Sequence, residues 1–129
     1  MAHINIYSKS LCVQCDGVLR TINKAITDGI IDPSQVTVYM MDGTEPRAGK
    51  VHERVEIIRI ESEEKQDALR TRLRNHPGTG TSSPAVFVQE TRDEKSAEID
   101  VFSGMNPGRL KTAIQTVSSS GTPALAATA

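Results

Sequence analysis

The sequence predicts an α/β domain in which a small mixed β-sheet carries helices on both faces. A short strand-like run at residues 3–7 leads directly into a helical pattern, and further strand-like runs follow that helix. A strand–helix–strand order of this kind predicts a right-handed parallel crossover. In the second half of the chain, a charged turn separates two strand-like runs, which predicts an antiparallel hairpin.

The composition indicates one domain with a modest, mainly aliphatic core. The chain has 129 residues, of which 37% are hydrophobic and 3% aromatic. Its 15 basic and 16 acidic residues give a net charge of −1, which points neither to nucleic acid nor to an anionic membrane as a partner. The sequence has no apolar stretch of about 18 residues and no signal-peptide pattern at its start. We therefore expect a cytoplasmic protein. We also expect it to be a monomer.

A change of period marks the first strand and the first helix. Residues 3–7 (HINIY) alternate as in a strand. From Val13 onward, apolar residues recur at the spacing of one helix face; they are Cys15, Val18, Leu19, Ile22 and Ile26. Gly29 predicts the end of this helix.

The middle of the chain contains two strand-like runs and a second helix. The runs are residues 36–41 and 55–60, and the polar segment between them predicts a long loop. Residues 62–75 are rich in helix formers, with Ser62 suited to the N-cap. The apolar stripe of this helix is thin, so we expect it to lie on the surface.

The last third predicts a hairpin and a final helix. A loop precedes Pro84, and strand-like runs follow at residues 85–88 and 99–102. Pro107 suits the first position of a helix, whose apolar face consists of Leu110, Ala113, Ile114 and Val117. Residues 118–129 show no periodicity, so we expect a domain over 1–117 and a disordered tail over 118–129.

The chemistry is concentrated in CVQC at residues 12–15, which holds both cysteines of the chain. One turn of helix separates two such Cα atoms by about 5 Å, within the range that a disulfide tolerates. The helix N-terminus stabilises a thiolate at Cys12, whereas Cys15 lies on the apolar face. Cys12 is therefore the predicted nucleophile and Cys15 the resolving thiol, with Lys9 assisting the thiolate and Asp16 weakly opposing it.

Other interpretations of the cysteine pair remain open. The three histidines are scattered and show no zinc-ligand spacing, so no metal site within one chain is expected, although two CVQC pairs could share a zinc ion in a dimer. The cysteines could also be inert core residues, which fits poorly with a cysteine that precedes the helix. A further alternative is a binding module with weak redox activity.

Three segments resemble the glutaredoxin-like NrdH-type redoxins, and the resemblance covers most of residues 3–117. They are INIYSKSLCVQC, SSPAVFV and FSGMNPGRL. The resemblance implies a thioredoxin-like fold with a mixed four-stranded sheet, and an extra strand and loop insertion around residues 32–54. It also implies a cis bond before Pro84 and a set of substrate-binding residues, namely Lys9, Val13, Gln14, Ser83, Pro84, Ser103, Gly104 and Met105.

The function implied is that of a dithiol–disulfide oxidoreductase that reduces protein disulfides, with ribonucleotide reductase as the expected substrate. Such a protein binds no cofactor and receives electrons from NADPH through a thioredoxin reductase-like flavoprotein. Glutathione is the less favoured reductant, because SGMNP stands where true glutaredoxins have a Gly-Gly-Cys-Asp-like segment. Phe102 and Met105 replace a tryptophan and a phenylalanine of the family. The segment 43–54 and the tail are expected to be dispensable for chemistry.

Overall fold

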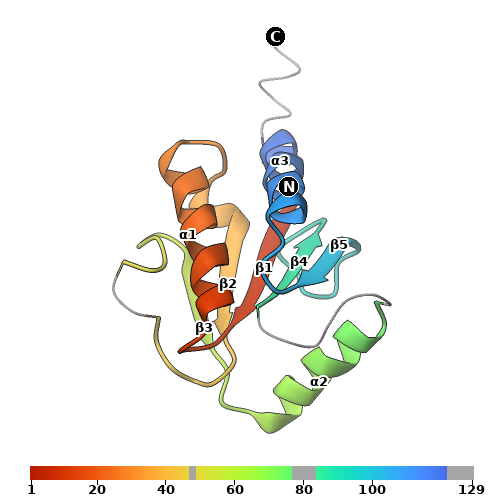
Figure 1. Cartoon of the computed structure of the whole chain (residues 1–129). Helices are drawn as coiled ribbons and strands as arrows, with labels where there is room; N and C mark the ends of the chain where they lie inside the picture. Colours follow the sequence, from red (N-terminus) through yellow and green to blue (C-terminus); the bar gives the residue numbers. More distant parts are fainter. Residues whose placement is uncertain (47–48, 77–83, 122–129) are drawn as a thin grey trace.

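A computed structural model of the chain describes residues 1–46, 49–76 and 84–121 (Figure 1). Its elements, in chain order, are β1 (His3–Ser8), α1 (Val13–Thr27), a short 3-10 helix (Pro33–Gln35), β2 (Val36–Met40), β3 (Glu56–Arg59), α2 (Glu63–Arg74), β4 (Ala85–Gln89), β5 (Glu98–Ser103) and α3 (Pro107–Gly121). None of the helices in the described ranges is both long and apolar enough to cross a membrane.

The strands that the described residues form make one five-stranded sheet with the order β3-β2-β1-β4-β5. β2 pairs with β1 and β3 with β2, both in parallel. β4 pairs antiparallel with both β1 and β5. The mixed sheet is therefore confirmed. The run at 36–41, which lies within the expected insertion at 32–54, forms the partner of β1. The additional strand at the outer edge comes after that insertion, in the run at 55–60.

Helices cover both faces of this sheet, as predicted. α1 and α3 lie side by side on one face (Figure 1). The core beneath them is aliphatic apart from Phe102, and its fully buried members include Ile4, Ile6, Val18, Val36, Val38, Val86, Val88, Leu110 and Val117. On the other face, α2 contributes Leu73 to a smaller cluster around Tyr7, Tyr39 and Phe87. Leu73 is the one fully buried side chain among the described residues of α2, in keeping with its thin apolar stripe.

The second face of β1 is polar at its start. His3 hydrogen-bonds through Nε2 to Thr37 Oγ1 at 2.7 Å, and Asn5 Nδ2 donates to Gln89 Oε1 at 2.8 Å. Gln89 in turn donates to carbonyl groups of the β4–β5 turn, among them that of Glu94 at 2.8 Å. Burial lowers the pKa of His3 to about 4, so the ring is neutral at pH 7. The turn therefore closes the part of this face that α2 leaves uncovered.

The domain end differs from the prediction in one respect. α3 continues to Gly121, so residues 118–121 are helical rather than part of a tail. Ser120 Oγ accepts a hydrogen bond from the Ala2 amide at 2.7 Å and donates to the Val117 carbonyl at 3.0 Å. These bonds tie the last turn of α3 to the start of β1. Residues 122–129 lie outside the described part of the chain.

We expect Gln35→Ala to lower the free energy of unfolding by about 1–3 kcal/mol, because buried groups would lose their partners. Gln35 Nε2 donates to the Val117 carbonyl at 3.0 Å, and its Oε1 accepts from the Asp32 amide at 3.0 Å. Urea titration would measure the change. Gln115→Ala, at an exposed position of α3, is the matched control and should change stability by less than about 0.5 kcal/mol. Equal stability of the two variants would contradict the assigned role.

Candidate active site

Cys12 and Cys15 form a disulfide at the start of α1, with 5.2 Å between their Cα atoms. Cys12 is the N-cap: its backbone is extended and its Sγ accepts a hydrogen bond from the Cys15 amide at 3.2 Å. Helix α1 begins at Val13 because the chain changes from the extended conformation of Cys12 to helical geometry there. The predicted spacing and the placement of Cys12 directly before the helix are both confirmed.

The two sulfur atoms have different environments. Cys15 is 1% exposed and belongs to the buried face of α1 together with Val18 and Leu19. Cys12 is half-buried and lines a groove on the surface. A reagent or substrate can therefore approach Cys12 from the groove, whereas Cys15 is covered.

Asp42 shapes the loop that leads into Cys12. It follows β2, and its Oδ2 accepts hydrogen bonds from the Ser10 amide at 2.9 Å and the Ser10 hydroxyl at 2.6 Å. Its Oδ1 accepts from the Thr44 hydroxyl at 2.6 Å. Burial acts to raise its pKa, but the bonds from Ser10 and Thr44 outweigh that effect and hold the pKa of Asp42 well below its usual range. The residue after Ser10, Leu11, has a φ of 51°, which is uncommon for a residue with a side chain.

Sequence reasoning missed the role of Asp42. The signal available was the tripeptide Asp42–Gly43–Thr44, which is typical of a turn closed by an aspartate side chain. Nothing local indicated that the same carboxylate would also reach Ser10. That contact arises because β1 and β2 are parallel neighbours and end at the same edge of the sheet.

Gln14 brings the segment after β5 to the cysteine pair. Its Oε1 accepts a hydrogen bond from the Met105 amide at 3.2 Å. Gly104 has a φ of 73°, and a Cβ there would lie 2.8 Å from Gln14 Oε1, so glycine allows this close approach. The Gly104 amide donates to the Pro84 carbonyl at 2.8 Å. Predicted site residues from three separate segments are thus connected. Ser83, and with it the predicted cis bond before Pro84, lies outside the described residues.

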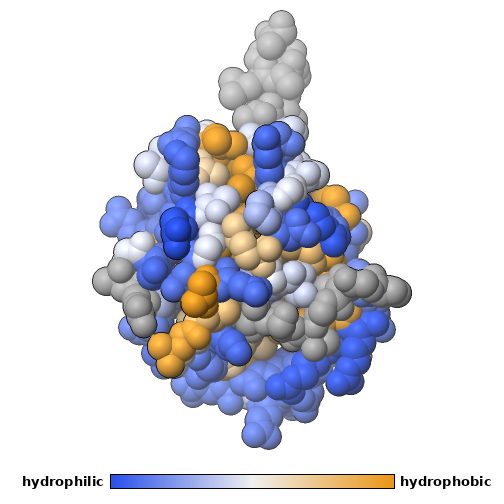
Figure 2. All heavy atoms as spheres, in the orientation of Figure 1, coloured by the Kyte–Doolittle hydropathy of each residue, from blue (hydrophilic) through white to orange (hydrophobic). Residues whose placement is uncertain are grey.

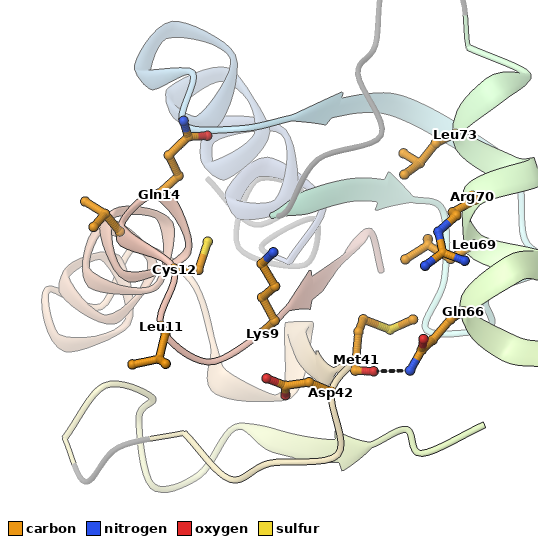
Figure 3. Close-up of a pocket in the computed structure, with 11 residues that line it drawn as sticks. Lys9, Leu11, Cys12, Gln14, Met41, Asp42, Gln66, Leu69, Arg70 and Leu73 are labelled. Carbon is orange, nitrogen blue, oxygen red and sulfur yellow. Dashed lines mark hydrogen bonds between the residues drawn. The ribbon is translucent and has the colours of Figure 1, made fainter. Parts of the chain in front are cut away.

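A groove of about 610 Å³ opens beside Cys12 (Figure 3). Figure 3 shows Cys12 and Lys9 facing side chains of α2 across it, with Gln66 of α2 donating to the Met41 carbonyl at 2.6 Å. The described residues that line the groove are Lys9, Leu11, Cys12, Val13, Gln14, Met41, Asp42, Gln66, Leu69, Arg70 and Leu73. The contribution of α2 was not predicted, because a surface helix gives no sequence signal of which segment it faces.

Exposed apolar side chains surround the cysteine pair. Leu11 is 89% exposed and Val13 is 87% exposed, while Met105 is 37% exposed and is the nearest side chain to Gly17 of α1. Figure 2 shows apolar side chains amid polar ones over the N-terminal end of α1. Val13 and Met105 were predicted to contact a substrate, and both are accessible for that role; Ser103 is half-buried at the end of β5. Within the described ranges, no cluster of three or more His, Cys, Asp or Glu side chains could hold a metal ion.

We expect Asp42→Asn to lower the free energy of unfolding at neutral pH by about 1 kcal/mol, a value reduced for the exposure of this carboxylate. The folded pKa is depressed, so the stabilisation is present above the unfolded pKa of about 3.9 and is lost as the pH falls through the folded pKa. Urea titrations at several pH values should therefore show the difference from wild type shrinking below about pH 4. Glu53→Gln, at another exposed carboxylate between β2 and β3, is the control. A difference independent of pH would rule out the ionised form as its cause.

Comparison with solved structures identifies the fold. No model of a protein family matches the chain, and no curated protein matches it by sequence. The crystal structure of a protein from Chlorobium tepidum, assigned as the thiol:disulfide interchange protein DsbE, superposes with a TM-score of 0.59. The two share 13% sequence identity, and the match covers 91% of this chain and 79% of the other. With its five-stranded mixed sheet and the helices on both faces, the chain has a thioredoxin-like fold.

Proposed function

We propose that this protein is a thiol–disulfide oxidoreductase that reduces protein disulfides through Cys12 and Cys15. The observation that carries the proposal is the asymmetry of the pair, in which an accessible Cys12 caps α1 and a covered Cys15 lies one turn later. Two cysteines at this spacing can alternate between a dithiol and a disulfide without moving the backbone far. The exposed partner can then exchange with disulfides in solution.

In the first step, the Cys12 thiolate attacks one sulfur of the substrate disulfide. A bond forms between Cys12 Sγ and that sulfur, and the other substrate sulfur leaves as a thiolate and takes up a proton. The amide of Cys15, which donates to Cys12 Sγ, and the positive end of the α1 dipole stabilise the attacking thiolate.

In the second step, Cys15 loses its proton and attacks Cys12 Sγ. The mixed disulfide breaks, the second substrate thiol is released, and the Cys12–Cys15 disulfide forms. The substrate has gained two electrons and the protein has lost two. NADPH then restores the dithiol through a thioredoxin reductase-like flavoprotein, in preference to glutathione.

The finer assignment rests on the sequence resemblance. CVQC and the segments around Pro84 and Met105 favour an NrdH-type, glutaredoxin-like redoxin of the cytoplasm, acting as a monomer on ribonucleotide reductase. The groove beside Cys12 and the apolar rim formed by Leu11 and Val13 suit an extended polypeptide that presents its disulfide to Cys12. The same rim favours, as the second candidate, a binding module with weak redox activity.

We predict that Cys12 is the more acidic and more accessible thiol. Reduced protein treated with limiting iodoacetamide near pH 6 should be labelled at Cys12 before Cys15, because a helix N-terminus lowers a thiol pKa from about 8.5 into the range of roughly 3.5–7.5. Peptide mapping by mass spectrometry would locate the label. Preferential labelling of Cys15 would reverse the two assigned roles.

We predict that the protein accelerates the reduction of insulin by dithiothreitol, and that Cys12→Ser abolishes the acceleration. Cys15→Ser should retain the first step only, so 5,5′-dithiobis(2-nitrobenzoic acid) should leave a stable mixed disulfide on Cys12 of this variant. Replacing dithiothreitol by NADPH with thioredoxin reductase, or by glutathione with glutathione reductase, separates the two recycling routes. Wild-type protein that leaves the rate unchanged would favour the binding module.

A further inference from the structure

The segment between β2 and β3 runs beside α1 (Figure 1) and is anchored on it. Asn23 of α1 holds it from both sides of Val51: its Nδ2 donates to the Lys50 carbonyl at 2.5 Å and its Oδ1 accepts from the His52 amide at 2.9 Å. Val51 packs against the main core cluster. The backbone at Lys50 is therefore fixed against α1.

From this anchor, the Lys50 ammonium reaches the first turn of α1. Its Nζ lies 3.5 Å from Oδ2 of Asp16, and the two side chains are 35% and 38% exposed. Asp16 follows Cys15 directly, and its amide donates to the Cys12 carbonyl at 3.0 Å. Residues i and i+4 of a helix have Cβ atoms about 5–6 Å apart, so we expect a charge on Asp16 to act through space on a thiolate at Cys12.

We propose that Lys50 is a redox-tuning residue, which pairs with Asp16 and offsets the repulsion between that carboxylate and the Cys12 thiolate. The proposal rests on the redox function given above. It also changes the expectation that the segment 43–54 is dispensable, since this segment supplies the ammonium group.

The other charged groups near Cys12 are Lys9, Asp42, Arg70 and Glu45. Lys9, Asp42 and Arg70 line the groove; Asp42 is bonded to Ser10 and Thr44, and Arg70 pairs with Asp67 at 2.5 Å. On the α1 side, Lys9, Asp16, Glu45 and Lys50 border a small cavity of about 60 Å³, together with the fully buried Ser8 hydroxyl. Glu45 pairs with Arg59 at 3.3 Å. Of the two lysines that border this cavity, Lys50 is the one that forms an ion pair with Asp16.

The size of the effect follows from Coulomb's law. Two unit charges about 8 Å apart in a water-like medium shift each other's pKa by about 0.4 unit. Lys50→Met keeps much of the aliphatic stem and removes the charge, so we expect it to raise the pKa of the Cys12 thiol by about that amount. The iodoacetamide rate at pH 6 should then fall about two- to threefold. Because the thiolate exists only in the reduced protein, the equilibrium constant for reduction by dithiothreitol should fall by a similar factor, or about 10 mV.

The experiment measures the pH dependence of Cys12 alkylation and the equilibrium with dithiothreitol for a set of variants. Asp16→Asn should lower the Cys12 pKa, Lys50→Met should raise it, and the double variant should return close to wild type. Lys50→Arg should preserve the wild-type value. Lys24→Met is the matched control, because Lys24 forms a similar pair with Asp28 at 3.3 Å near the other end of α1, too far away to affect Cys12.

The outcomes separate this inference from the proposed function. A reversible Cys12–Cys15 couple whose pKa and equilibrium do not respond to Lys50→Met would overturn the inference alone. A double variant in which the Cys12 pKa is raised as much as in Lys50→Met would also overturn it. The effect of Lys50 would then not depend on the charge of Asp16. The proposed function itself would be overturned if dithiothreitol did not reduce the Cys12–Cys15 disulfide and oxidised dithiothreitol did not re-form it.

Discussion

The parallel pairing of β1 with β2 is the constraint on which the site depends. Parallel strands end at the same edge of a sheet, and α1 must start at that edge to cross back over the sheet. The N-terminus of α1, the loop before Cys12 and the turn after β2 therefore meet in one place. This meeting point explains why Asp42 can hold Ser10 and why the Cys15 amide, in the first turn of the helix, donates to the sulfur of Cys12.

The two faces of the sheet contribute differently to the site. The face under α1 and α3 is aliphatic and continuous, and it fixes α1 through Val18 and Ile22. The opposite face combines aromatic and polar side chains; Tyr7 bonds both Arg72 of α2 and Glu94 of the β4–β5 turn. α2 forms one wall of the groove and is held to the sheet by few buried side chains. It is therefore packed less tightly than α1, which carries the cysteine pair. We infer that the groove can adjust while the cysteine pair stays fixed.

Local sequence patterns were enough to predict those features that are determined within one short segment of the chain. The spacing of Cys12 and Cys15 and the helix that follows them predicted the separation of the pair and the burial of Cys15. The strand-like runs predicted the elements of the sheet. The pairing partner of β1 could not be chosen, because residues 36–41 and 55–60 are similar apolar runs and parallel pairing leaves no local signal. The end of α3 was misjudged for a related reason, since its last turn is serine-rich and is held by a bond from Ser120 to Ala2.

The position of the extra segment explains how it comes to neighbour the cysteines. Any chain that leaves the end of β2 emerges at the edge where α1 begins, so an insertion between β2 and β3 starts at the site. An insertion in the β4–β5 turn would lie at the opposite edge, where Gln89 is paired with His3 at the start of β1. Asn23 of α1 then fixes this segment to the helix, because its side chain hydrogen-bonds to the backbone on both sides of Val51. A segment with few core residues thus brings an ammonium group to the first turn of α1, where Lys50 pairs with Asp16.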